Sequence, residues 1–329
     1  MKKIGVNGFG RIGRYFTRLA LDSTEIDVAV VNDISDIHTL AHLLKYDSIH
    51  RGLKHTFEII DSKIVFDNGK EIHFTQEKDP SKIEWKKFGV EIVLESTGLF
   101  LTTETLQQHF IGGAKKVVLS APSKSEDIKT IVLGVNDQLI EESDVLLSNA
   151  SCTTNNAAPM LKVMMQLCTI ESAYITTVHS YTSDQRLQDA PHKDLRRARG
   201  AAQSIVPTST GAAKALTKIF PELDGKLGGC GVRVPVPDGS FTDLTMVVKN
   251  PPTVEEIKQA MKIASETYLK NILTYTEDPI VSVDIIGNTS SCLFDAELTS
   301  VINNMVKVVG WYDNEAGYSN RLMDLMSKI

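Results

Sequence analysis

The sequence predicts a protein of the α/β class built as two domains, and three observations lead to this prediction. The chain has 329 residues, which is more than one compact core usually supports. Its first half alternates short apolar runs with helical patterns. Its second half carries several strand patterns and one long amphipathic helix. We therefore expect a doubly wound, Rossmann-type parallel sheet, followed by an α+β domain built on a large antiparallel sheet.

The composition is that of an ordinary globular protein, with 42% hydrophobic and 23% charged residues. The net charge of −6 argues against a dedicated nucleic-acid-binding protein. The chain enters a strand pattern directly after Met1, and no apolar run approaches the roughly 18 residues of a membrane span. Its four cysteines are scattered without Cys-x-x-Cys spacing, which predicts neither a metal site nor a disulfide framework. We expect a soluble, cytoplasmic protein with no membrane partner.

The first motif lies between an expected strand at 3–7 and an expected helix at 14–20. It reads Gly8-Phe9-Gly10-Arg11-Ile12-Gly13, the Gly-x-Gly-x-x-Gly pattern in its strand-to-helix setting. The first glycine permits a tight turn, the second lets a pyrophosphate approach the backbone, and the third lets the helix pack on the strand. The alternative is a glycine-rich turn without a ligand. We favour dinucleotide binding because of the acid described next.

An acidic residue follows the second expected strand, 27–31. Asp33 lies 20 residues beyond Gly13, where an acid that hydrogen-bonds a ribose diol is expected. Its carboxylate would repel a 2′-phosphate, and no arginine stands beside it to neutralise the charge. The sequence therefore favours NAD over NADP. His38 and His42 are one helical turn apart in the next helix, but no third ligand accompanies them, so we expect surface histidines.

The rest of the first half continues the parallel sheet after an antiparallel excursion of short strands at 57–75. Further elements are expected as strands at 90–95, 116–120, 131–134 and 145–147, with a helix at 105–111. Ligands of such sheets lie beyond the carboxyl ends of the strands. Ser96, Thr97 and Ser120 lie at those ends.

One cysteine, Cys152, follows the strand at 145–147 among small hydroxyl and amide residues. Backbone N–H groups at a helix start can stabilise a thiolate and hold anions, which favours a nucleophile here. The alternative is an ordinary helix N-cap with a packed cysteine. The helix is expected at 157–165, with Pro159 in its first turn.

A histidine ends the strand expected at 173–178. His179 follows Cys152 by 27 residues, and an imidazole beside a thiol lowers the pKa of the thiol. The alternative is a core histidine bonded to the backbone. Spacing alone does not decide between the two.

Residues 184–204 are rich in charge, which usually marks a solvated face. They precede a hydroxyl-rich turn at 205–214 that leads into a helix. Arginines, hydroxyls and a helix N-terminus together make an oxyanion site, with phosphate as the expected occupant. Arg233 lies in an apolar strand and needs an anionic partner. The remaining elements are expected as strands at 241–248, 280–286, 291–295 and 305–311, a helix at 254–269 and a last helix opening in 311–319.

Together these residues resemble one family, phosphorylating glyceraldehyde-3-phosphate dehydrogenase. The octet Ser148-Asn149-Ala150-Ser151-Cys152-Thr153-Thr154-Asn155 is highly specific. The other matching stretches lie in register at 4–14, 45–48, 179–182, 207–214, 233–235 and 311–315.

The resemblance implies a mechanism. Cys152 attacks the aldehyde carbon, and His179 takes its proton and steadies the resulting thiolate–imidazolium pair. Hydride passes to the nicotinamide, and inorganic phosphate attacks the thioester that remains, giving 1,3-bisphosphoglycerate. Thr182 and Arg233 would hold the phosphate of glyceraldehyde 3-phosphate. The attacking phosphate would be held by Ser151, Thr153, Arg197, Thr210 and Gly211. NAD would be held by Gly8, Gly10, Arg11, Ile12, Gly13, Asp33, Ser120 and Asn314, with Tyr318 near the nicotinamide.

The resemblance also implies how the chain divides into domains and how its subunits assemble. Residues 1–150 would form the NAD-binding domain, to which a C-terminal helix at 314–329 would return, and 151–313 the catalytic domain. The loop at 181–204 would pack against a neighbouring subunit, which implies a homotetramer.

The sequence departs from the family pattern in several places. Asn156 stands where many members have a second cysteine, and Ala190-Pro191 and Ile34 stand where relatives that accept NADP tend to carry serine and threonine, which favours NAD. The loop after Ser48 reads His50-Arg51-Gly52-Leu53, so residues 49–55 are expected to be shaped differently. Asp238-Gly239-Ser240 replaces a common Asn-Val-Ser, with no consequence that the sequence alone supplies. Two rival functions remain: an erythrose-4-phosphate dehydrogenase, which hydrolyses its thioester, and a non-catalytic NAD-binding scaffold.

Overall fold

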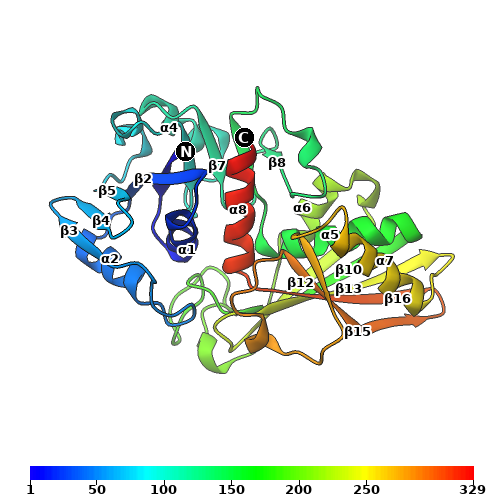
Figure 1. The fold of residues 1–329 in the computed structure, drawn as a ribbon. Helices are drawn as coiled ribbons and strands as arrows, with labels where there is room; N and C mark the ends of the chain where they lie inside the picture. The colour runs from blue at the N-terminus through cyan, green and yellow to red at the C-terminus, as the bar shows by residue number, and fades with distance from the viewer. The chain divides into compact units, whose positions relative to one another are not determined.

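The computed structural model describes residues 1–329, and the chain divides into two compact units (Figure 1). The first unit comprises Met1–Ile131, Gln138–Ala150 and Ser319–Ile329, and the second comprises Val132–Asp137 and Ser151–Tyr318. Each unit is built on a sheet of its own. None of the helices is both long enough and apolar enough to cross a membrane.

The first unit contains a nine-stranded sheet in the order β3-β4-β5-β2-β1-β6-β7-β9-β8. Its strands are β1 (Lys2–Asn7), β2 (Ile26–Asn32), β3 (Phe57–Ile60), β4 (Lys63–Phe66), β5 (Glu71–Thr75), β6 (Ile92–Glu95), β7 (Lys116–Leu119), β8 (Lys129–Thr130) and β9 (Leu146–Ser148). All neighbouring pairs are parallel except β3 with β4 and β4 with β5. The doubly wound sheet with an antiparallel excursion is therefore confirmed.

The central strands are apolar because helices and loops bury them on both faces. Ile4, Val6, Val30, Val93 and Val117 are fully buried. The helices of this unit are α1 (Arg11–Leu21), α2 (Ile37–Lys45), α3 (Thr103–Leu106) and α4 (Gln108–Ile111), with short 3₁₀ turns at Pro80–Lys82, Trp85–Phe88 and Asp137–Leu139. The last helix, α8 (Ala316–Lys328), belongs to the first unit from Ser319 onwards.

Two expectations for the first half were wrong in detail. The helix expected at 105–111 is two short helices separated at Gln107. The strand expected at 131–134 is a turn, because Gly134 has φ +77° and the Val132 N–H is bonded to the Asn136 side chain. His38 and His42 are exposed on α2, as expected of surface histidines.

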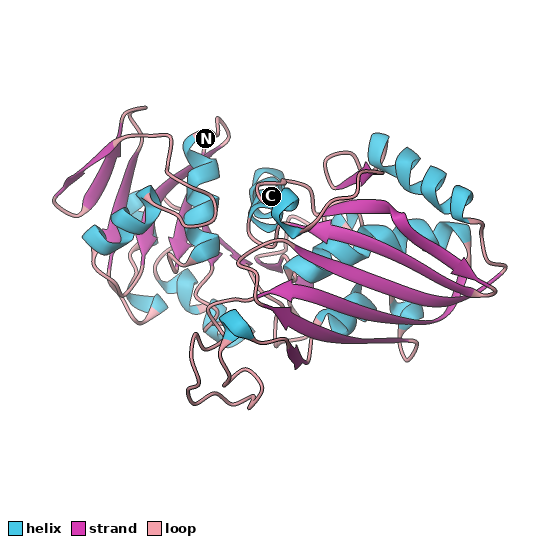
Figure 2. Cartoon of the chain, turned by 90° about the horizontal axis from the view of Figure 1, so that it is seen from below, coloured by secondary structure: helices cyan, strands magenta, loops and turns pink.

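The second unit contains a seven-stranded sheet in the order β11-β12-β10-β13-β16-β15-β14. Its strands are β10 (Thr169–Ser180), β11 (Val206–Thr208), β12 (Leu227–Val234), β13 (Ser240–Lys249), β14 (Leu273–Thr276), β15 (Cys292–Ile302) and β16 (Met305–Tyr312). The sheet is antiparallel except for β10 with β12 and β14 with β15. Figure 2 shows its long strands side by side, with helices behind them. The second α+β domain is confirmed.

The helices of the second unit are α5 (Cys152–Leu167), α6 (Ala212–Ile219) and α7 (Val254–Glu266), with 3₁₀ turns at Ala201–Gln203, Pro221–Leu223 and Ser282–Ile285. Two expectations were wrong here. Pro159 lies in the middle of α5 and not in its first turn, because the helix already begins after Ser151. The strand expected at 280–286 is the last of these 3₁₀ turns, where the Asp284 carboxylate accepts from the Val281 N–H.

Candidate active site and cofactor-binding site

Cys152 is the first residue of α5. Ser151 caps the helix: its backbone is extended, and its hydroxyl oxygen accepts a hydrogen bond from the Thr154 N–H at 3.1 Å. The cysteine therefore lies at the positive end of a helix of 16 residues. The helix dipole there favours the thiolate over the thiol.

His179 lies against the cysteine from the end of β10. Its Nε2 is 3.5 Å from the Cys152 Sγ. In the register of β10 with β12, His179 stands beside Arg233. The Arg233 Nη1 lies 2.7 Å from the His179 Nδ1 and donates to the Ser180 carbonyl oxygen at 2.9 Å. The His179 imidazole thus contacts the Cys152 thiol on one side and the Arg233 guanidinium on the other.

Burial sets the electrostatics of these three groups. Burial raises the pKa of Cys152 to about 11, although Arg233 and the Thr153 N–H act in the opposite direction. Burial and the adjacent Arg233 lower the pKa of His179 to about 3. Each group alone is therefore held neutral. The proton can instead pass from sulfur to Nε2, which creates two opposite charges 3.5 Å apart, and their attraction in a buried site is strong. The geometry can therefore accommodate a joint ionisation of the two groups.

The partners of His179 Nδ1 are of opposite kinds. Arg233 can only donate to it, whereas the Ser180 carbonyl oxygen, 2.8 Å away, can only accept from it. With Nδ1 bonded to Ser180, Nε2 presents its lone pair to the thiol. With Nδ1 bonded to Arg233, Nε2 carries the proton. The tautomer of His179 therefore depends on whether Arg233 is engaged elsewhere.

Tyr312, at the end of β16, supports both parts of this site, although it carried no role in the sequence analysis. Its hydroxyl lies 2.8 Å from the Thr153 Oγ1 and 2.9 Å from the Thr177 Oγ1. Its ring meets the His179 ring edge-on, with centroids 5.9 Å apart. Burial raises the pKa of Tyr312, so its hydroxyl stays neutral. The only signal in the sequence was its place in the motif at 311–315.

Arg197, expected to hold a phosphate, has protein partners of its own. Its Nη1 donates to Asp184 at 2.5 Å and its Nε to the Thr208 hydroxyl at 2.9 Å. That hydroxyl in turn donates to Asp194 at 3.0 Å. The charge-rich segment at 184–204 is therefore more than a solvated face, because its acids hold this arginine. The sequence analysis missed Asp184, Asp194 and Thr208.

The remaining hydroxyl and amide groups occupy turns near strand and helix ends. The Thr210 hydroxyl accepts from the Ala212 N–H at the start of α6, and Gly211 lies between them as the N-cap. Thr182 follows β10, and its carbonyl oxygen accepts from the Gln185 N–H.

Asn314 has a fixed side-chain orientation. Its Oδ1 accepts from the hydroxyls of Ser180 and Ser240, both at 2.8 Å. The amide oxygen is thereby engaged, and the amide NH₂ is left to face the other way. Tyr318 is buried in α8.

In the first unit the glycine motif has the geometry of a dinucleotide-binding turn. Gly8 has φ +93°, and a Cβ on it would lie 2.7 Å from the Thr97 nitrogen. A Cβ on Gly13 would lie 2.2 Å from the Gly8 carbonyl oxygen, so α1 packs directly on the turn. Gly10 faces open space, where a pyrophosphate can approach the backbone at the start of α1. These positions fit NAD.

Asp33 is held against this turn. Its Oδ2 accepts from the Phe9 N–H at 2.8 Å, and its Oδ1 accepts from the Ser35 N–H at 2.9 Å. Both oxygens keep further acceptor capacity for a ribose diol. Ile12 lies in the first turn of α1, and Ser120 follows β7, with its N–H bonded to the Glu95 carbonyl oxygen.

Arg11 is tied to the loop after α2 by two bonds to Asp47, at 2.5 and 3.1 Å. Burial alone would raise the pKa of Asp47. The bonds from Arg11 and from the His50 and Ile49 amides outweigh burial and bring it to about 2. This loop departs from the family pattern, and Arg51 within it has φ +66°.

Taken together, the two units define a class: a dehydrogenase with a nucleotide-binding parallel sheet and a second domain that carries a cysteine beside a histidine. Comparison with known families makes this specific. The family model described as glyceraldehyde 3-phosphate dehydrogenase, NAD binding domain, matches residues 2–103, and that described as glyceraldehyde 3-phosphate dehydrogenase, C-terminal domain, matches residues 151–314. The chain belongs to the glyceraldehyde 3-phosphate dehydrogenase family, and its cofactor is NAD.

Curated relatives match along the whole chain. A glyceraldehyde-3-phosphate dehydrogenase of Geobacillus stearothermophilus is 53% identical over 329 residues, covering 99% of this chain and 98% of the relative. The glyceraldehyde-3-phosphate dehydrogenase of Streptomyces coelicolor is 52% identical over 327 residues, covering 98% and 97%. Glyceraldehyde-3-phosphate dehydrogenase 1 of Bacillus cereus is 50% identical over 327 residues, covering 99% and 97%.

Proposed function

We propose that this protein oxidises D-glyceraldehyde 3-phosphate, with NAD and inorganic phosphate, to 1,3-bisphosphoglycerate, in glycolysis or its reverse. The observation that carries the proposal is the series Cys152, His179 and Arg233 at the N-terminus of α5, with Sγ and Nε2 3.5 Å apart. The family of the chain supplies the substrate class.

The reaction begins with proton transfer from the Cys152 Sγ to the His179 Nε2. The thiolate attacks the aldehyde carbon, forming the S–C bond, and the imidazolium returns its proton to the carbonyl oxygen. NAD, when bound, supplies the hydride acceptor. As the hydride leaves, His179 takes back the hydroxyl proton and a thioester to Cys152 remains. A phosphate oxygen then attacks the thioester, and the C–S bond breaks to release the thiolate.

Arg233 links substrate binding to this proton transfer. Its charge beside Nδ1 opposes formation of an imidazolium. We propose that the substrate's phosphate, held by Arg233 and Thr182, neutralises that charge and draws the guanidinium away. Nδ1 is then left bonded to the Ser180 carbonyl oxygen, in the tautomer that accepts the thiol proton.

The attacking phosphate is assigned to a set of hydroxyl, backbone and guanidinium groups: Ser151, Thr153, Arg197, Thr210 and Gly211. The support for four of them is positional: Ser151 and Thr153 lie at the start of α5, and Thr210 and Gly211 directly precede α6, where N–H groups favour anions. Arg197 would exchange its bond to Asp184 for the phosphate.

NAD is assigned to the glycine turn and the residues around it. Gly8, Gly10 and Gly13 shape the turn, Arg11 and Ile12 begin α1, and Asp33 would bind the ribose diol. Ser120 and Asn314 would also hold NAD, with Tyr318 near the nicotinamide. The fixed amide of Asn314 supports its part, since its NH₂ is oriented before the cofactor arrives.

The organisation is proposed in the same way. Residues 1–150 with 314–329 would be the NAD-binding domain and 151–313 the catalytic domain. The protein would be a cytoplasmic homotetramer. One face of the second unit's sheet supports assembly: its half-exposed residues include Phe241 and Val178, which pair across β13 and β10, and the exposed Tyr174. A second copy of the chain would cover this face.

The test is NADH formation from glyceraldehyde 3-phosphate, with and without inorganic phosphate, beside Cys152→Ser. Turnover that requires phosphate and is lost in the variant is expected. Turnover indifferent to phosphate would indicate hydrolysis of the thioester, as in an erythrose-4-phosphate dehydrogenase, and would remove the phosphate-site assignment. Absence of turnover together with intact NAD binding would favour a scaffold.

A further inference from the structure

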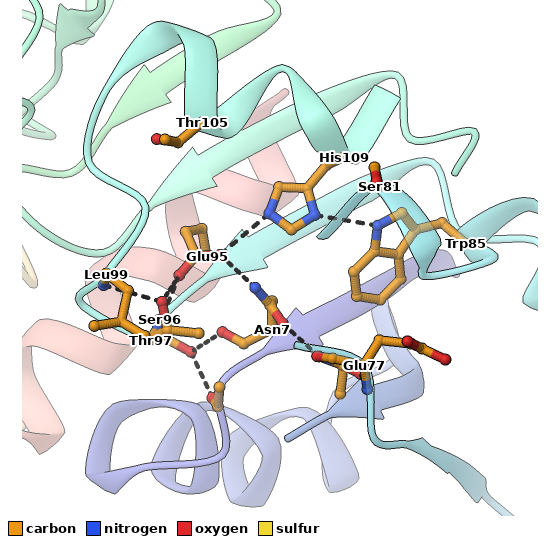
Figure 3. Close-up of polar contacts among 12 residues, drawn as sticks. Asn7, Glu77, Ser81, Trp85, Glu95, Ser96, Thr97, Leu99, Thr105 and His109 are labelled. Carbon is orange, nitrogen blue, oxygen red and sulfur yellow. Dashed lines mark hydrogen bonds and ion pairs between the residues drawn. The ribbon is translucent and has the colours of Figure 1, made fainter. Parts of the chain in front are cut away.

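A fully buried carboxylate lies at the carboxyl end of β6, in the first unit. Glu95 has no exposed surface, and neither has its neighbour His109. Figure 3 shows the groups that converge on it. One oxygen accepts from the Asn7 Nδ2 at 2.6 Å and lies 3.1 Å from the His109 Nε2. The other accepts from the Thr97 N–H at 2.8 Å and the Thr97 hydroxyl at 2.5 Å.

The protons on one side are fixed by a tryptophan. The indole N–H of Trp85 can only donate, and it lies 3.2 Å from the His109 Nδ1. That nitrogen must therefore accept, which places the proton of a neutral imidazole on Nε2. His109 donates this proton to Glu95. A protonated His109 would bring a second N–H against the indole.

The protons on the other side are fixed by a backbone amide. The Glu77 N–H donates to the Asn32 Oδ1 at 2.8 Å, so the Asn32 Nδ2 is the donor to the Asn7 Oδ1, also at 2.8 Å. Asn7 must then present its own Nδ2 to Glu95. Neither asparagine can flip without setting two donors face to face.

Every neighbour of the carboxylate is thus a donor. The Thr97 hydroxyl accepts from the Leu99 N–H, which leaves its proton for Glu95. A protonated Glu95 could donate its hydrogen only to the second lone pair of the Thr97 hydroxyl, and that hydroxyl would then lose its own bond to Glu95. The donor groups of Asn7, Thr97 and His109 therefore favour Glu95 as a carboxylate beside a neutral His109, and a hydrogen bond to a carboxylate is assisted by charge.

The residues that Glu95 holds lie on both sides of the glycine turn. Asn7 directly precedes Gly8, and the Thr97 nitrogen is the backbone atom that a Cβ on Gly8 would meet. Between Glu95 and Thr97, the Ser96 hydroxyl donates to the Gly8 carbonyl oxygen at 2.7 Å. That same oxygen limits the approach of α1 at Gly13. The Glu95 carboxylate therefore links the ends of β1 and β6 through its hydrogen bonds with Asn7 and Thr97.

We propose that Glu95 is a positioning residue for NAD: as a buried anion satisfied only by donors, it fixes the Gly8 turn and hence the start of α1. A buried charge without a cationic partner costs stability, so its retention points to a role beyond packing. The proposal rests on the NAD-binding turn assigned under the proposed function.

The test is Glu95→Gln, which keeps the shape of the side chain. Its NH₂ must face a donor whichever way the amide turns, because Thr97 N–H lies on one side and Asn7 with His109 on the other. We expect the Kd for NAD, measured by calorimetry on the protein without substrate, to rise about tenfold. The KM for glyceraldehyde 3-phosphate and the kcat at saturating NAD should stay within about twofold, since Glu95 does not belong to the second unit.

Two control variants separate positioning from stability. Glu91→Gln makes the same change at an exposed residue paired with Lys115, just before the start of β6, and should leave the Kd unchanged. Val93→Ala opens a cavity inside the same strand and should lower the melting temperature of the NAD-free protein without raising the Kd. A Glu95→Gln protein whose NAD affinity falls no further than that of Val93→Ala would overturn the proposal.

A second pair of variants decides the question if Glu95→Gln does not fold. Thr97→Val removes one donor to the carboxylate, whereas Thr97→Ser keeps it. The proposal expects a raised Kd for NAD with valine and recovery with serine, and equal affinities would contradict it. Failure of the wild-type protein to bind NAD would refute the proposed function itself, and so is distinguishable from failure of this inference.

Discussion

Two buried histidines of this protein differ in the partners of their ring nitrogens. His109, in the first unit, has a pure donor on one nitrogen and a carboxylate on the other, so a single protonation state satisfies it. His179, in the second unit, has a donor and an acceptor competing for the same nitrogen. Fixed hydrogen-bond direction suits a group that holds a backbone turn in place. Ambiguous direction suits a group that must take up and return a proton.

A half-buried histidine near the surface completes the comparison. His55 meets Asp22 through Nε2 and Asp67 through Nδ1, both at 2.9 Å. With an acceptor on each nitrogen, the doubly protonated ring is favoured. The three rings thus differ in their partners: His109 has a donor and an acceptor on separate nitrogens, His179 has both at one nitrogen, and His55 has an acceptor on each nitrogen, which raises its pKa.

The largest effect is expected from changing the donor beside His179. Arg233→Lys keeps the positive charge but loses the planar guanidinium that reaches both Nδ1 and the Ser180 carbonyl oxygen. We expect kcat/KM for glyceraldehyde 3-phosphate to fall by roughly 10- to 100-fold, mostly through KM, because one charge-assisted anion contact is weakened. Steady-state kinetics check this, and the Kd for NAD should not move. An unchanged KM would show that Arg233 does not hold the substrate.

A smaller effect is expected from removing the Trp85 hydrogen bond that fixes the tautomer of His109. Trp85→Phe removes the indole N–H that fixes the tautomer and leaves Nδ1 buried without a donor, at a cost of about 1–3 kcal/mol. The melting temperature should fall by several degrees, as measured by calorimetry. Trp311→Phe is the matched control, since its N–H donates to Asp295 in the second unit. It should leave the Kd for NAD unchanged, whereas Trp85→Phe should raise it about twofold. Equal effects of the two variants on NAD binding would break the comparison.

The smallest effect is expected at His55. Hydrogen bonds from Asp22 and Asp67 raise the pKa of His55 above its ordinary value. A raised pKa in the folded state stabilises the fold below the unfolded value of about 6.5, and this contribution is lost as the pH rises through the folded pKa. The effect is modest because both acids are well exposed. The melting temperature of His55→Gln should therefore change less between pH 6 and 8 than that of the wild type. Identical pH profiles would contradict the assignment.

Much of the fold could be predicted because its signals are local. The Gly-x-Gly-x-x-Gly turn and Asp33 follow from spacing, and the parallel strands follow from short apolar runs. The apolar run at 280–286 misled because Val281 and Val283 are exposed around a 3₁₀ turn. The apolar run at 131–134 misled because a strand and a turn can bury the same side chains. Only the backbone, with Gly134 at φ +77°, distinguishes them.

The site could be predicted less completely because its contacts are tertiary. The resemblance named Cys152, His179 and Arg233, and the register of β10 with β12 brings the last two together. Nothing in the sequence pairs Asp184 with Arg197, or Trp85 and Asn7 with the residues they meet around Glu95. Such partners depend on which strand ends and loops the fold brings into contact, and a single sequence carries no signal for that.

The joint ionisation of Cys152 and His179 is tested most directly by the rate at which iodoacetamide alkylates Cys152, measured against pH. In the wild type with inorganic phosphate present to engage Arg233, we expect His179 to take the thiol proton and alkylation to be fast at neutral pH. In His179→Gln the buried thiol stands alone, and burial raises its pKa towards about 11. Alkylation of this variant at pH 7 should fall at least about tenfold and rise steadily with pH. Superimposable profiles for the two proteins would show that His179 does not hold the proton of Cys152.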